Sequence, residues 1–150
     1  MATLFHSWFF VDLSAGEVVS AADVRGMLVM TNTTCDTEEE ALDLADFTTI
    51  DEADGVGYAQ ATVANVTVAW DATLNALKID GDDSNFTSGS TLDACTRNLE
   101  GILWYRYVDG TDANDVPWFF STDGGFPKTP SGGAATYAFD ADGVINVQQQ

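Results

Sequence analysis

Catalysis by a nucleophile needs a base that accepts the nucleophile's proton, and histidine serves most often. The chain of 150 residues contains one histidine, His6, which lies between Phe5 and Trp8 in an apolar segment. That setting favours a histidine packed in a core or an interface over a catalytic base. The sequence also has no Gly-x-Ser-x-Gly motif, the turn that presents the serine of α/β-hydrolases. We therefore predict that the chain is not an enzyme.

Acidic side chains are the other groups that could do chemistry, either as a carboxylate pair on a glycoside or as oxygen ligands of Ca²⁺. The two candidate clusters for a cation are Asp80, Asp82 and Asp83, and Asp109, Asp112 and Asp115. The first cluster lacks the glycine and the final acid of an EF-hand loop, at Asn85 and Thr91. Asp and Asn also shape turns with their own side chains, which is the competing interpretation. We predict no metal and no cofactor.

The charge of the chain restricts its partners. Twenty-four acidic and five basic residues give a formal net charge of −19 and a pI of about 4.1. Such a chain has no basic surface to neutralise phosphates, so we expect neither a nucleic acid nor a membrane as a partner. Asp outnumbers Glu and Lys is nearly absent. This pattern suits a protein from a marine or saline source, and plain solubility is the alternative explanation.

The two cysteines, Cys35 and Cys95, are expected to be reduced. The N-terminal segment has no positively charged region and is interrupted by Asp12, so it is not predicted to be a signal peptide. Chains made without a signal peptide rarely carry disulfides.

Most of the chain is predicted to form short strands. The expected strands are 24–30, 58–63, 66–70, 74–79, 102–108, 116–122, 135–139 and 144–147. The turn at 71–73 predicts one hairpin, and Asp140–Gly143 predicts another. Segment 3–13 is apolar nearly all round, which leaves helix and strand both open. We expect short helices near 3–14 and 37–45, with a solvated acidic loop as the alternative at 37–45.

Many short strands separated by turns predict one mainly-β domain over residues 1–150, as a β-sandwich or a barrel-like fold. One or two short helices would lie in the N-terminal third. Residues 1–15 would form an N-terminal arm or helix, and 148–150 a polar tail.

Aromatic residues concentrate on two neighbouring predicted strands: Trp104, Tyr105, Tyr107, Trp118, Phe119 and Phe120. Side chains alternate between the faces of a strand, so half should be core and half exposed or buried against another protein. This favours a binding or packing surface over an active site. The interface candidates are Leu4, Phe5, Trp8, Phe9, Trp118, Phe119 and Phe120.

The order of motifs in the chain carries a resemblance. In the C-terminal half it comprises Gly101–Tyr105, the acidic turn Asp109–Asp112, Val116–Asp123, the loop Phe126–Gly133, Thr136–Asp140 and Asp142–Val147. In the N-terminal half it comprises Gly16, Met27–Val29, Thr37–Asp46 and Gly57–Tyr58. These motifs resemble a family of small virion proteins of tailed phages. The chain departs from the family in its acidity and at Arg106-Tyr107.

The resemblance implies a structural protein of a tailed bacteriophage or archaeal virus. Its expected role is capsid decoration: a cement protein bound to the outer surface of the major capsid lattice, which it stabilises. Its partners would be the major capsid protein and copies of itself, with a trimer favoured. It would be made in the host cytoplasm and reside on the capsid surface.

Two alternatives remain open at this point. A tail or baseplate component belongs to the same class and would form a ring. A carbohydrate-binding β-sandwich module belongs to another class and would show a solvent-open shelf of Trp and Tyr. A decoration protein is expected to have no deep pocket.

Overall fold

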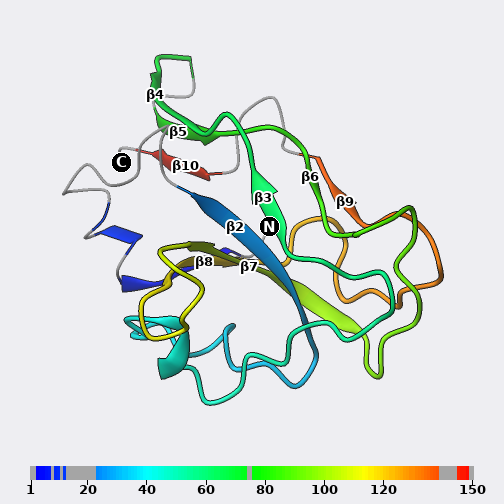
Figure 1. Ribbon diagram of the computed structural model, residues 1–150. Helices are drawn as coiled ribbons and strands as arrows, with labels where there is room; N and C mark the ends of the chain where they lie inside the picture. The colour runs from blue at the N-terminus through cyan, green and yellow to red at the C-terminus, as the bar shows by residue number, and fades with distance from the viewer. Residues whose placement is uncertain are drawn as a thin grey trace.

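A five-stranded antiparallel sheet lies at the centre of the structure, in the order β1-β8-β7-β2-β3 (Figure 1). The computed structural model describes residues 3–7, 9–10, 12, 23–73, 76–138 and 145–148, and 37% of it is strand. The strands of this sheet are β1 (Thr3–Phe5), β2 (Val24–Met30), β3 (Ala61–Val63), β7 (Leu99–Arg106) and β8 (Val116–Ser121). Among the described residues, no helix is long and apolar enough to span a membrane. The predicted mainly-β fold is confirmed.

Two small sheets accompany the large one. The first has the order β10-β5-β4, and the second pairs β6 with β9. Their strands are β4 (Thr67–Asp71), β5 (Ala76–Asp80), β6 (Ser84–Asn85), β9 (Thr136–Tyr137) and β10 (Ile145–Gln148). The hairpin predicted around residues 71–73 is confirmed, because β4 and β5 pair antiparallel with Asp71 opposite Ala76.

The second predicted hairpin, joining strands at 135–139 and 144–147, is wrong. β9 pairs with β6, whereas β10 pairs with β5, so the two strands belong to different sheets. The predicted turn itself, Asp140–Gly143, lies outside the described residues. A turn signal favours a reversal of the chain but does not select the neighbour of each strand. Here the pairing partners are supplied by strands distant in sequence, which extend both small sheets.

The first hydrophobic core lies between the large sheet and the two small sheets. Val24, Leu28 and Met30 of β2 share one face of the large sheet with Ile102 and Trp104 of β7. Val63 of β3 joins them from the same sheet, and Val66, Ile79 and Phe86 pack against them from the covering segments. Figure 1 shows both small sheets on one side of β2 and β7.

The second core covers the opposite face of the large sheet. Its sheet residues are Met27, Val29, Leu103, Tyr105 and Phe120, and its covering residues are Cys35, Ala41, Leu44 and Phe47. Burial raises the pKa of the Cys35 thiol to about 12, so it stays protonated at neutral pH. Cys35 and Cys95 are both free thiols.

The covering segment is a turn-rich loop that ends in the 3-10 helix η1 (Leu44–Asp46), so the helix predicted over 37–45 is wrong. Side chains compete here with a helical backbone. The Glu38 carboxylate accepts hydrogen bonds from the hydroxyls of Thr34 (2.7 Å) and Thr48 (2.6 Å). Such bonds close the loop on itself in place of a helical ladder. The alternative interpretation, an acidic loop, is the one that the structure shows.

The N-terminal segment packs on the chain's own sheet. Thr3–Phe5 form β1, with Leu4 opposite Phe120 of β8, so the predicted helix does not begin at residue 3. Ser7, Phe9, Phe10 and Asp12 have helical backbone. The remaining residues of the predicted helix, Trp8, Val11, Leu13 and Ser14, lie outside the described residues.

Candidate functional site

The aromatic strand predicted as an interface is buried. Trp118, Phe119 and Phe120 are only 1–3% exposed. Trp104 lies opposite Phe119 and Tyr105 opposite Pro117, so Trp118 is the extra residue of a β-bulge. The bulge places both Trp118 and Phe119 in the first core, while Phe120 joins the second. The expectation that half of these aromatic side chains would be exposed or buried against another protein is wrong, because the chain itself covers both faces of the sheet.

The N-terminal interface candidates that the structure describes are also buried or half-buried against the two cores. Phe9 is fully buried in the first core, and Leu4 and Phe5 are half-buried against the two cores. Trp8 lies outside the described residues. Phe10 is half exposed, although sequence reasoning did not single it out.

A different apolar surface lies on strand β4. This strand is an edge of its sheet, since only β5 pairs with it among the described strands. Trp70 of β4 is 55% exposed, and Thr67 and Ala69 are exposed on the opposite face of the strand. An edge strand carries unpaired backbone groups that can bind another strand.

The two aspartate clusters serve turns. Asp80 forms an ion pair with Lys78 (2.9 Å), and Asp82 accepts a hydrogen bond from the Asn65 side chain (2.7 Å). The buried Asp115 carboxylate accepts from the Val108 amide (2.7 Å), and Asp109 accepts from the Thr111 amide (2.8 Å). In the described part of the chain, no three His, Cys, Asp or Glu side chains gather as metal ligands.

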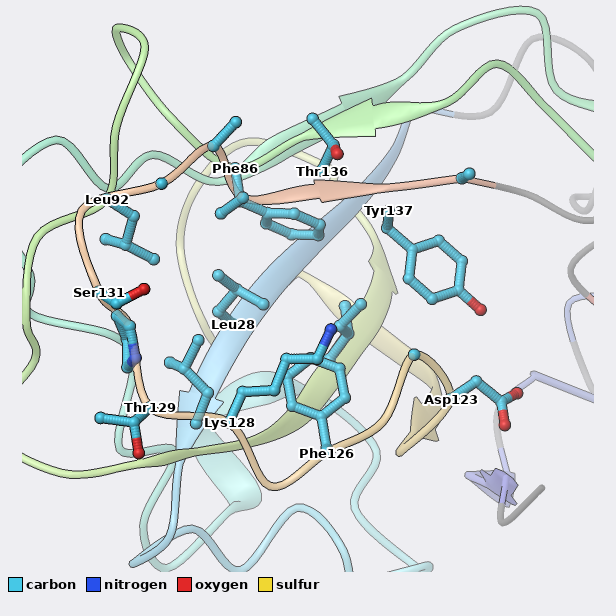
Figure 2. A pocket seen from close by; sticks show the side chains of 18 residues that line it. Leu28, Phe86, Leu92, Asp123, Phe126, Lys128, Thr129, Ser131, Thr136 and Tyr137 are labelled. Carbon is cyan, nitrogen blue, oxygen red and sulfur yellow. The ribbon is translucent and has the colours of Figure 1, made fainter.

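A cavity of about 520 Å³ opens on the first-core side of the large sheet (Figure 2). Apolar side chains from several strands and loops form its floor: Leu28, Phe86, Leu92, Leu99 and Ile102. The loop from Asp123 to Ala138 forms its wall. A volume of a few hundred cubic ångströms is typical of small-ligand sites.

Backbone hydrogen bonds hold this wall in place. The Leu99 amide donates to the Lys128 carbonyl (2.7 Å), and the Lys128 amide donates back to Leu99 (2.9 Å). The Leu92 amide donates to Gly133 (2.9 Å), and the Phe86 amide donates to Ala135 (2.8 Å). The loop is therefore fastened to the floor at three points, and the cavity between them is a defined part of the fold.

Lys128 is the basic side chain at this cavity. Figure 2 shows its side chain extending across the cavity beside Phe126, and its Nζ lies 5.5 Å from the centre of that ring. The other four basic residues form ion pairs, namely Arg25 with Asp23, Lys78 with Asp80, Arg97 with Asp51 and Arg106 with Asp12. Lys128 forms no ion pair with any residue that the structure describes.

A second cavity, of about 430 Å³, lies on the other side of the large sheet and contains a polar network. The Glu52 carboxylate accepts hydrogen bonds from the Tyr58 hydroxyl (2.7 Å) and the Gln60 amide (2.8 Å). The Tyr105 hydroxyl donates to Gln60 (2.6 Å). Burial raises the pKa of both tyrosines, that of Tyr105 to about 12, so both remain neutral donors. These side chains form hydrogen bonds with one another, so we assign the network a structural role.

His6 is fully buried, and its ring meets Phe47 edge-on at 5.2 Å. Neither imidazole nitrogen has a partner of hydrogen-bonding geometry among the described residues. Burial lowers the pKa of His6 to about 4, against a smaller raising effect of the nearby Glu38 and Glu39 carbonyls. The ring is therefore neutral at neutral pH, consistent with the predicted core histidine.

No protein-family model matches the chain, and no curated protein or solved structure is significantly similar to it.

The sequence did not predict that β4 presents an exposed surface, and it did not predict the cavity. The loop Phe126–Gly133 is one of the motifs of the resemblance, and no role was predicted for it. Residues 123–133 do carry a signal in their composition, because they combine Phe126 and two prolines with one of the five basic residues of the chain. Of the floor residues, Leu28 and Ile102 lie on predicted strands, whereas Phe86, Leu92 and Leu99 lie outside them.

Proposed function

We propose that this chain is a structural protein of a tailed-virus particle, most specifically a decoration protein on the outer surface of the capsid lattice. The observation that carries the proposal is the edge of β4, which pairs only with β5 among the described strands, with Trp70 exposed on it. The order of motifs described above supplies the virion context. The partners would be the major capsid protein and copies of this chain, with a trimer favoured.

The edge of β4 suits attachment to a repeating shell. Its backbone can extend a neighbour's sheet, which gives orientation, and Trp70 can bury its ring, which gives affinity. Within Thr67–Asp71 there is no lysine and no proline, two residues that often protect such an edge, and the one charge is Asp71 at the end. This strand replaces the buried Trp118–Phe120 as the proposed contact.

The net charge of −19 fits an outward position. A strongly acidic protein is repelled by packaged DNA and by other acidic copies, so contact through an apolar strand is favoured over contact through its charged surface. We also propose a β-sandwich as the finer class of the fold, because the first core lies between the large sheet and the small ones. No catalytic step is included in the proposal.

The cavity departs from the expectation that a decoration protein has no deep pocket. The carbohydrate-binding alternative is weakened by the burial of Trp104, Tyr105 and Trp118, which removes the expected aromatic shelf. Trp70 remains as an exposed ring on which a sugar could stack. A tail or baseplate component could use the same β4 edge to close a ring.

The experiment compares Trp70→Ser with Val56→Ser for binding to particles that lack this protein. Val56 is 75% exposed and lies on a loop away from β4, so it controls for loss of surface apolar area. We expect Trp70→Ser to lower affinity about 30-fold, the loss typical of an interface hot spot, and Val56→Ser to bind normally. Equal binding by both variants, each folded, would remove β4 as the contact.

A further inference from the structure

We propose that the cavity under the loop 123–138 binds a small amphiphile with an apolar body and one carboxylate, such as a medium-chain fatty acid. The inference rests on the cavity itself and is independent of the proposed function.

The apolar floor of the cavity favours a ligand with an apolar body. Leu28, Leu92 and Leu99 come from three separate segments and line one space with Phe86 and Ile102. Figure 2 shows Leu28, Phe86 and Leu92 on one side of this space and Phe126 and Tyr137 on the other. A cavity of about 520 Å³ is large enough for an alkyl chain or an aromatic ring system.

The carboxylate of the proposed ligand is inferred from the position of Lys128. Its backbone is fixed by the paired hydrogen bonds with Leu99, and its side chain extends across the cavity. In a chain with nearly five acidic residues for every basic one, each of the other four cations is paired with a carboxylate, whereas Lys128 pairs with none of the described residues. A ligand carboxylate would supply the missing partner beside an apolar surface, where charge-assisted bonds are strong.

A ligand with one negative charge is favoured over a ligand with two. Asp123 lies at the rim of the cavity, and the whole chain is strongly acidic, so a second anionic group would meet repulsion without a second cation. Lys128 is exposed to solvent, and a neutral ligand would make no ion pair with its ammonium group. The ligand class is therefore a monoanion.

The test is calorimetric titration of the whole protein with octanoate, decanoate and decanol at near-physiological salt. We expect decanoate to bind saturably, and affinity to rise about fourfold for each methylene between octanoate and decanoate. Lys128→Met keeps the aliphatic stem and should lower decanoate affinity about tenfold while leaving decanol binding unchanged. Lys78→Met makes the same change in net charge outside the cavity and should bind decanoate as the wild type does.

Three results would overturn the proposal: no saturable binding of decanoate, equal decanoate binding by Lys128→Met and wild type, or equal binding of decanol and decanoate by the wild type. Thermal melting confirms that each variant is folded. If Lys128→Met fails to fold, the comparison of decanoate with decanol on the wild-type protein decides the question alone.

Discussion

The Arg106 guanidinium and the Asp12 carboxylate form an ion pair, with Nε 2.9 Å and Nη2 3.2 Å from the two carboxylate oxygens. Asp12 also accepts a hydrogen bond from the indole nitrogen of Trp118 at 2.8 Å. The carboxylate is 3% exposed. One buried acid thus joins the N-terminal segment to β7 and β8, the two strands that carry most of the aromatic core.

Asp12→Ala should destabilise the protein by about 3 kcal/mol, because it leaves the Arg106 charge and the Trp118 indole without their shared acceptor. Chemical denaturation measures this loss. Asp23→Ala is the matched control, since Asp23 pairs with Arg25 near the surface and should cost less than about 1 kcal/mol. Equal losses in the two variants would contradict the role given to Asp12.

His6 should make stability depend on pH between about 6.5 and 4. Burial holds its folded-state pKa at about 4, below the ordinary value of 6.5, so the unfolded chain takes up the proton first as the pH falls. The free energy of unfolding should therefore drop by about 3 kcal/mol across this window. The hydrogen bond from Arg97 lowers the pKa of Asp51, so that carboxylate loses its contribution only below its ordinary value of 3.8.

His6→Leu isolates this effect from the titration of other groups. Denaturation curves measured from neutral pH down to pH 4 should show a smaller drop for the variant than for the wild type. Parallel pH profiles for the two proteins would show that His6 is not the buried neutral group described here.

A substitution at Gly26 on β2 tests how closely the first core is packed. A Cβ at this position would lie 2.8 Å from the Trp104 ring and 3.1 Å from Phe86, so Gly26→Ala should destabilise by about 1–3 kcal/mol through overpacking. Gly89→Ala, where a Cβ would meet nothing within 4 Å, should leave stability nearly unchanged. Thermal melts of both variants measure the difference, and a neutral Gly26→Ala would mean that Trp104 does not pack there.

Salt should stabilise the protein, because a net charge of −19 on a small domain repels itself. Raising NaCl from about 0.01 M to about 1 M shortens the Debye length from about 30 Å to about 3 Å, and the free energy of unfolding should rise accordingly. A variant with the exposed acids Asp36, Glu39 and Glu40 neutralised should gain less from the same salt. Identical stability at both salt concentrations would contradict this expectation.

The sequence predicted strands where local pattern decides. β2 falls exactly on the expected 24–30, and the hairpin of β4 and β5 follows its turn at 71–73. The predictions were wrong where contacts between distant segments decide the structure. β9 pairs with β6 and β10 pairs with β5, and the acidic loop covers the face of the sheet that contains Phe120. The bulge at Trp118 likewise breaks the simple alternation on which the exposed-aromatic prediction relied. For the cavity, only Leu28 and Ile102 of the floor lie on predicted strands, whereas the loop that forms the wall and the isolation of Lys128 depend on tertiary contacts.

The most direct test of the proposed role is a reconstruction of the virus particle with this chain located in the density. The account predicts copies on the outer surface of the capsid lattice, with the β4 edge and Trp70 against a neighbouring subunit. Density in a tail or baseplate ring, or particles that contain none of this chain, would contradict it.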